Sequence, residues 1–148
     1  LQYSSKHLAN RNRKMLKQLM FPLTLQIGHI VLSCFWNLVG VYLIAQNLEP
    51  LGPSASLKTV FILVGLGALL VVAGYRSLVF YVLVSLILAL GALSAIVNAF
   101  LQAADLWPSE YWRVGGVVLN AAGLIGAVWG IGCSMKNIYS KKSESYVR

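Results

Sequence analysis

Residues 57–102 read LKTVFILVGLGALLVVAGYRSLVFYVLVSLILALGALSAIVNAFLQ, which is two long apolar runs separated by the segment Gly74-Tyr75-Arg76-Ser77. Runs of about 19 and 26 residues, coiled at 1.5 Å per residue, are long enough to cross a hydrocarbon core of about 30 Å. A connection this short forces the two helices into an antiparallel hairpin. We expect Gly74 to adopt a left-handed backbone conformation that ends the first helix, and Ser77 to cap the following helix.

Two further apolar runs flank this hairpin, and the four predicted spans lie at about 21–46, 57–75, 77–102 and 111–135. The sequence therefore predicts an all-α polytopic membrane protein with four antiparallel transmembrane helices in a bundle, within residues 21–136. Residues 1–20 form a basic segment that we interpret as an amphipathic helix at the membrane interface. Residues 137–148 form a polar tail. The prolines lie in loops or at span ends, so we expect no broken helix.

The composition excludes a soluble domain. Only 11% of the residues are charged and 58% are hydrophobic, whereas a soluble domain carries about a quarter charged residues. The net charge of +8 does not indicate a nucleic-acid partner, because no aromatic residues interleave with the basic ones in a groove-like pattern.

The basic residues predict the orientation in the membrane. Ten of the 12 Lys and Arg residues fall in the N-terminal segment, at Arg76 or in the tail, which leaves Lys58 and Arg113 for the other side. By the positive-inside rule, both termini are expected in the cytoplasm. A bacterial inner membrane is favoured over a eukaryotic membrane. Five N-terminal residues are candidates for contact with anionic lipid, although a topology signal is the simpler interpretation: Lys6, Arg11, Arg13, Lys14 and Lys17.

One polar stripe runs along the first span. Gln26, His29, Ser33 and Asn37 have the spacing of a single helix face, and lipid cannot satisfy their hydrogen bonds. Hydrogen bonding between helices is the ordinary role of such residues, and a pore lining or a contact to a ligand is the alternative.

Depth estimates along the helices predict which polar groups meet. We expect His29 to lie near Ser85, and Asn37 to hydrogen-bond with Asn120 of the fourth span, because each pair should sit at the same depth. The same reasoning argues against a disulfide between Cys34 and Cys133.

Small residues recur every four positions on the last two spans. This spacing lets helix backbones approach closely, either inside the bundle or against another protein. The candidate helix-packing residues are Gly91, Ala95 and Ala99 on the third span, and Ala122, Gly126 and Gly130 on the fourth.

The sequence carries no motif for catalysis, metal binding or nucleotide binding. His29 is the only ionisable candidate of the kind on which pumps and coupled transporters depend, and it lacks a second intramembrane histidine for haem. We expect no catalytic residue, metal or cofactor, apart from bound lipid.

These observations favour a non-catalytic membrane subunit that packs against, stabilises or regulates a larger membrane complex. Its partner would be another integral membrane protein or a second copy of the chain. The alternative is a small oligomeric transporter or channel that uses the stripe on the first span. A membrane enzyme acting on lipid or quinone is the third possibility. A water-accessible cavity at His29 would favour transport, whereas a sealed stripe would favour the subunit.

Overall fold

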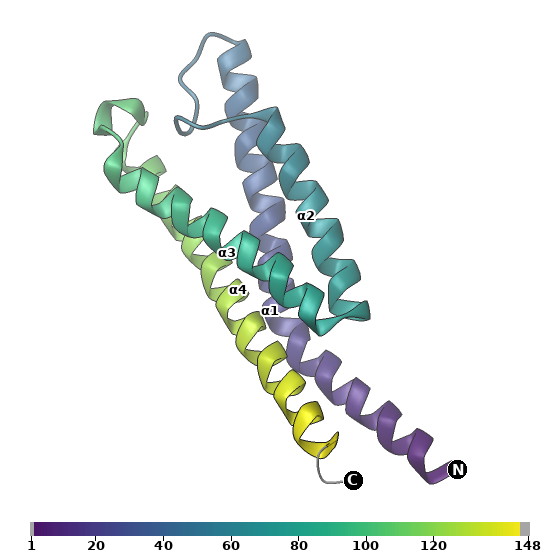
Figure 1. Cartoon of the computed structure of the whole chain (residues 1–148). Coiled ribbons are helices and arrows are strands. Elements are labelled where there is room, and N and C mark those ends of the chain that lie inside the picture. The colour runs from purple at the N-terminus through teal and green to yellow at the C-terminus, as the bar shows by residue number, and fades with distance from the viewer. Residues whose placement is uncertain (1, 146–148) are drawn as a thin grey trace.

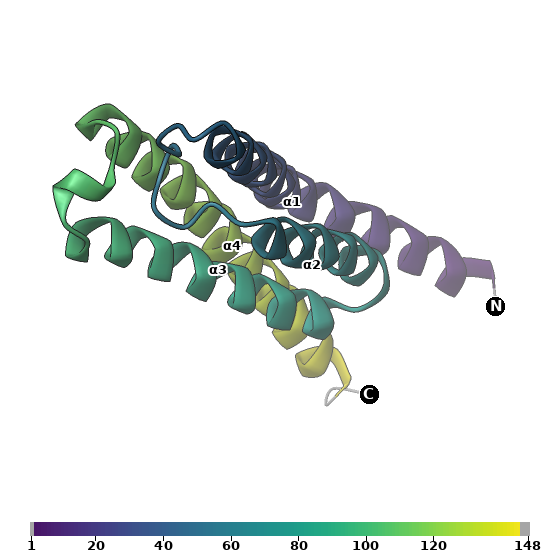
Figure 2. The ribbon, with the colours of Figure 1, turned by 90° about the horizontal axis from the view of Figure 1, so that it is seen from above.

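The computed structural model describes residues 2–145, with side chains described for residues 17–140. Four helices make up the bundle in this part of the chain: α1 (Gln2–Ala45), α2 (Leu57–Arg76), α3 (Leu78–Leu101) and α4 (Glu110–Ser145), with the short 3-10 helix η1 (Ala104–Leu106) before α4. Each helix contacts its neighbour in the chain, and α4 also contacts α1, which closes the ring (Figure 1, Figure 2). The predicted all-α four-helix bundle is confirmed.

All four helices contain a stretch that is long and apolar enough to cross a membrane. These stretches are Lys17–Ala45, Leu57–Arg76, Leu78–Leu101 and Glu110–Ser140. Large apolar side chains cover the outside of the bundle, with Phe61 75% and Leu101 77% exposed. An outer surface of this kind is stable only in lipid, so the fold is that of an integral membrane protein.

The turn between α2 and α3 depends on Ser77. Its extended backbone ends α2, and its N–H donates to Ala73 O at 2.8 Å. Its hydroxyl then accepts from Phe80 N at 3.3 Å and caps α3, as predicted. The expected left-handed conformation at Gly74 is wrong, since Gly74 is a buried part of α2 and no described glycine has a positive φ. Because Ser77 closes the last turn itself, a left-handed residue is not required.

Helix α1 is longer than predicted. It runs without a break from Gln2 to Ala45, with Pro22 in its interior. Residues 2–20 of the basic segment continue the first span as one helix, and the position of this segment at the membrane interface stays a prediction. A proline inside a membrane helix is tolerated when neighbouring helices satisfy the freed backbone groups, and Pro22 is fully buried. Helix α4 likewise continues into the polar tail.

The two ends of the bundle differ in packing. We call the end with the chain termini and the α2–α3 turn the terminal side, and the end with the α1–α2 and α3–α4 connections the loop side (Figure 1). The tightest core lies near the terminal side, where Leu70, Ala73 and Tyr81 are completely buried. Toward the loop side α2 and α3 diverge (Figure 1). Residues of this loop half also line a cavity.

Candidate functional site

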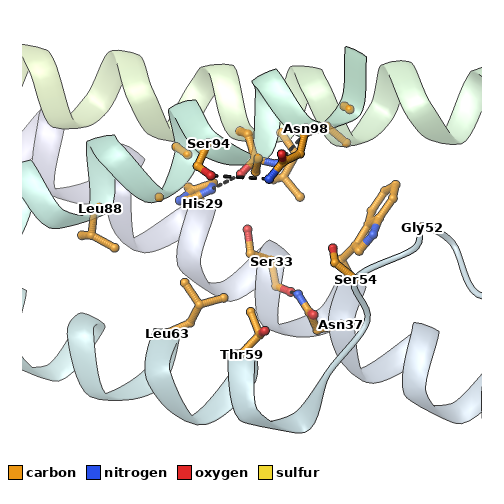
Figure 3. A pocket seen from close by; sticks show the side chains of 18 of the residues that line it. His29, Ser33, Asn37, Gly52, Ser54, Thr59, Leu63, Leu88, Ser94 and Asn98 are labelled. Atoms are coloured by element: carbon orange, nitrogen blue, oxygen red, sulfur yellow. Dashed lines mark hydrogen bonds between the residues drawn. The ribbon is translucent and has the colours of Figure 1, made fainter. Parts of the chain in front are cut away.

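A cavity of about 450 Å³ lies in the loop half of the bundle. Side chains from all four helices and from both loops line it (Figure 3). Its volume is within the range of small-molecule sites. Polar residues from several elements line it beside apolar ones, and they are His29, Ser33, Trp36, Asn37, Ser54, Thr59, Ser94, Asn98, Gln102, Trp107 and Asn120.

The polar stripe of α1 divides between the cavity and the core. His29, Ser33 and Asn37 line the cavity, as Figure 3 shows. Gln26, one turn nearer the terminal side, is 1% exposed and donates from Nε2 to the Tyr81 hydroxyl at 2.6 Å. All four residues of the stripe therefore face the inside of the bundle, and three of them, His29, Ser33 and Asn37, line the cavity.

Helix α3 contributes a second polar stripe that the sequence analysis missed. Ser94, Asn98 and Gln102 are spaced every four residues and line the cavity. Asn98 Nδ2 donates to Ser94 Oγ at 3.5 Å. The regular spacing of these polar residues on an otherwise apolar span is the sequence signal that could have predicted this stripe. Ser94 and Asn98 are labelled at the wall of the cavity in Figure 3.

His29 pairs with Asn120 rather than with Ser85, which corrects the predicted neighbour. The ring Nε2 lies 3.4 Å from Asn120 Oδ1, and Ser85 Oγ has no hydrogen-bond partner in the described part of the chain. Gly123 makes this arrangement possible, because a Cβ there would overlap the imidazole ring. The imidazole is 7% exposed.

The predicted bond between Asn37 and Asn120 is wrong. Asn120 donates to Gly116 O at 2.8 Å, whereas Asn37 donates to Ser33 O at 2.9 Å and accepts from Ser56 N at 3.1 Å. Asn37 therefore anchors the start of α2. The contact of Gly123 with His29 sets how α4 is aligned with α1. In this alignment Asn120 lies about 7 Å nearer the terminal side than Asn37, by helical rise.

Two tryptophans, Trp36 of α1 and Trp107 of the α3–α4 connection, line the cavity at its loop-side end. The ring of Trp107 lies against Gly52, where a Cβ would be only 2.9 Å from the indole. The indole nitrogen of Trp107 is buried and has no partner among the described residues. Trp36 stacks edge-on against Trp112, with ring centroids 5.5 Å apart. The rings of both tryptophans therefore line the cavity at its loop-side end.

The lining carries no formal charge. None of the lining residues is Asp, Glu, Lys or Arg, and the ion pair of Glu110 with Arg113 is exposed and does not line the cavity. No group of three or more His, Cys, Asp or Glu residues within the described chain could hold a metal ion. Cys34 and Cys133 are both free thiols. The cavity thus presents neutral donors and acceptors and one imidazole.

The small-residue ladders have two different roles. On α4, Gly126 lies against Leu25 and Gln26 of α1, and Gly130 lies against Gln26 and Tyr81. Ala122, one turn away, is half-buried. This ladder serves packing inside the bundle.

On α3, Gly91 and Ala95 line the cavity, and their packing against a helix of another protein stays a prediction. A Cβ on Gly91 would meet no atom within 4 Å, because α2 diverges from α3 at this level. Ala99 is 3% exposed. The small residues of α3 therefore leave space for the cavity. Of the candidate lipid-contact residues, Lys17 is exposed, and the side chains of Lys6, Arg11, Arg13 and Lys14 lie outside the described range.

We expect His29 and Asn120 to be energetically coupled. Replacing each with leucine, singly and together, should reveal a coupling of about 0.6 kcal/mol in thermal unfolding in detergent, the average for intramembrane hydrogen bonds. His29→Leu combined with Asn37→Leu is the control and should be additive, because Asn37 makes no bond to His29. Additivity in both cycles would contradict the pairing.

No family model matches the chain, and searches of curated proteins and of solved structures find no similar protein.

Proposed function

We propose that the chain is a small membrane transporter that binds an uncharged amphiphilic molecule in the cavity of its loop half. The observation that carries the proposal is the cavity itself, about 450 Å³ in volume and lined by both neutral polar groups and apolar side chains. A sealed stripe would favour a purely structural subunit. A stripe that faces open space at His29 supports binding and transport of a ligand.

The chemistry of the lining selects the ligand class. A buried ionic ligand would need a counter-charge, and the lining supplies none. Amide and hydroxyl groups instead match a neutral head group, such as an alcohol, amide or carbonyl. Leu63, Leu66 and Leu88 suit an apolar body. Lipids with neutral head groups and quinone-like molecules both belong to this class.

The cavity is accessible from the bilayer. Ile62 of α2 and Ile87 of α3 line it and are 51% and 53% exposed. Gly91 lies between the diverging helices with open space in front of it. A membrane-dissolved ligand can therefore reach the cavity sideways, between α2 and α3.

Filling the cavity tests this function. Gly91→Phe should place a ring in the cavity without a clash, and helix propensity should rise. Gly65→Phe on α2 is the matched control, because Gly65 is exposed, faces open space and does not line the cavity. Each protein is purified from its membrane, and the small molecules that co-purify are identified by mass spectrometry. We expect Gly91→Phe alone to lose a bound amphiphile, and equal contents in both variants would refute the proposal.

A second candidate is the membrane subunit, in which a helix of a partner protein fills the opening between α2 and α3. The Ser94–Asn98 pair favours it, since both residues are exposed at this opening and can bond to a polar residue of a passing helix. The same experiment separates the two functions. Loss of a protein from the purified Gly91→Phe variant, with no change in small molecules, would favour the subunit.

We further propose that the terminal side faces the cytoplasm of a bacterial cell. The basic residues Arg76 and Lys136 lie at that end of the spans, as the positive-inside rule requires. Reporter domains fused to either terminus should remain cytoplasmic. A translocated reporter at either end would contradict this orientation.

A further inference from the structure

An apolar groove of about 680 Å³ runs between α1 and α2, which lie side by side (Figure 2). The groove shares no lining residue with the cavity of the loop half. Every residue that lines it is apolar apart from Cys34, whose thiol donates to Val60 O at 3.9 Å. Gly67 and Ala68 of α2 line it with little or no side chain. A surface of this kind fits a hydrocarbon chain.

The groove has the length of one acyl chain in one leaflet. Its lining on α1 extends from Ile27 to Leu38, which corresponds to about 16 Å of helical rise. One leaflet supplies half of a hydrocarbon core of about 30 Å. A single acyl chain therefore matches the groove from end to end.

A contact between α1 and α2 identifies the residues that border the terminal end of the groove. A Cβ on Gly74 would lie 3.7 Å from the Leu23 side chain, so these two residues are at the same depth. Leu23 is about one turn from Ile27, the last groove residue of α1, and Gly74 is two residues from Val72, the last groove residue of α2. Residues next to Leu23 and Gly74 therefore lie at the terminal mouth of the groove.

Two hydroxyl groups lie at this mouth. Thr24 is one turn from Ile27, and Tyr75 is one turn from Val71, so both continue the groove-lining face of their helix. Both side chains are exposed. They can donate hydrogen bonds to a ligand whose apolar part fills the groove.

Two cations follow the hydroxyl groups toward the terminal side. Arg76 comes directly after Tyr75 and ends α2, and Lys17 lies about 9 Å beyond Leu23 on α1 by helical rise. Both cations are exposed. The acidic residues with described side chains all lie on the loop side, and they are Glu49, Asp105 and Glu110. The charge at the terminal mouth therefore favours an anionic ligand.

We propose that the groove is a binding site for an anionic phospholipid. One acyl chain lies in the groove, and the ester region of the lipid meets Thr24 and Tyr75. The phosphate meets Arg76 and Lys17, whose long side chains reach to the level of the head groups. Apolar lining, hydroxyl groups and cations thus follow one another in the order of the matching parts of a phospholipid. This site goes beyond the proposed function, because it is separate from the cavity and takes a charged ligand.

Lipid binding in detergent tests the preference for an anionic head group. The full chain is purified in a mild detergent, and phosphatidylglycerol or phosphatidylcholine with the same acyl chains is added. Native mass spectrometry measures the affinity of the first bound lipid. We expect phosphatidylglycerol to bind about fivefold more tightly or better, since each basic residue near the surface attracts an anionic lipid by about that factor. Equal affinities would overturn the proposal.

A matched pair of charge variants separates a local site from the general attraction of a basic surface. Arg76→Gln should weaken the binding of phosphatidylglycerol about fivefold. Lys136→Gln is the control and should leave this affinity unchanged, because Lys136 is exposed on α4 at the same side and α4 does not line the groove. Equal losses in the two variants would show general attraction only and would overturn the site.

Filling the groove tests the place of the acyl chain. Ala68→Phe puts a ring into the groove from an exposed position, and Gly65→Phe is the control, because Gly65 is exposed on the same helix and does not line the groove. We expect Ala68→Phe alone to weaken the first phosphatidylglycerol. Equal affinities in the two folded variants would overturn the proposal, whatever the outcome of the cavity experiment. If Ala68→Phe does not fold, the comparison of Arg76→Gln with Lys136→Gln decides.

Discussion

Replacing Gly130 with alanine should destabilise the bundle by about 1–3 kcal/mol, the usual range for overpacking a core. A Cβ at this position would overlap the Tyr81 hydroxyl and lie 3.0 Å from Gln26 Nε2. Both side chains are almost completely buried and joined by a hydrogen bond, so neither can move away without breaking that bond. Gly130→Leu adds more volume at the same point, and we expect it to prevent assembly of the bundle.

Tyr81→Phe provides the internal test of this prediction. It removes the hydroxyl oxygen that the new Cβ would meet, so Gly130→Ala should be less destabilising in the Tyr81→Phe background. Gly132→Ala is the matched control on the same helix, because a Cβ at Gly132 would meet no atom within 4 Å. Thermal unfolding in detergent measures all four proteins. Equal effects of the alanine substitutions at 130 and 132 would show that the close contact is absent.

The number, position and hairpin arrangement of the spans were predictable from the sequence, because each depends on local properties. An apolar run must match the thickness of the membrane, and a connection as short as the one ending at Ser77 permits only an antiparallel hairpin. The cap at Ser77 likewise depends on its own hydroxyl and a backbone N–H three residues away. None of these features requires knowledge of which helix faces which.

The pairing of side chains between helices was not predictable in the same way. The expected bond between Asn37 and Asn120 assumed that Phe21 and Lys136 mark the same depth. In the structure α1 continues through Pro22 into the basic segment, and the close fit of Gly123 against His29 sets the register instead. A displacement of α4 along α1 by about 7 Å, or about five residues of helical rise, is enough to give each side chain a different partner on the other helix.

The cavity depends on a tertiary feature that no single helix encodes. Part of its lining on α1 was predictable, because Ser33 and His29 are polar residues in an apolar span. The spacing of small residues predicted helix packing for Gly91, but a small residue favours close approach only when a second helix is present. Here α2 diverges from α3 (Figure 1), and the same small residue leaves open space.

Cysteines placed at Gly91 and Gly65 should differ sharply in their reaction with a water-soluble maleimide. Both residues are exposed, and a Cβ on either would meet no atom within 4 Å. Gly65 lies about two turns and Gly91 about three turns from the loop-side end of its helix. Gly91 lines the cavity among amide and hydroxyl groups, whereas Gly65 does not. Water in the cavity would allow the thiol at position 91 to ionise and react, and lipid would prevent both at position 65.

The experiment requires a background in which Cys34 and Cys133 are replaced by alanine, and membranes to which the reagent is added on the loop side. We expect extensive labelling of Gly91→Cys and almost none of Gly65→Cys. Labelling after denaturation in detergent shows that both thiols are present and reduced. If both positions are equally protected in the folded protein, the cavity is filled by lipid or by a partner helix. In that case the polar groups around His29 serve to bind that occupant, and a water-filled substrate site is ruled out.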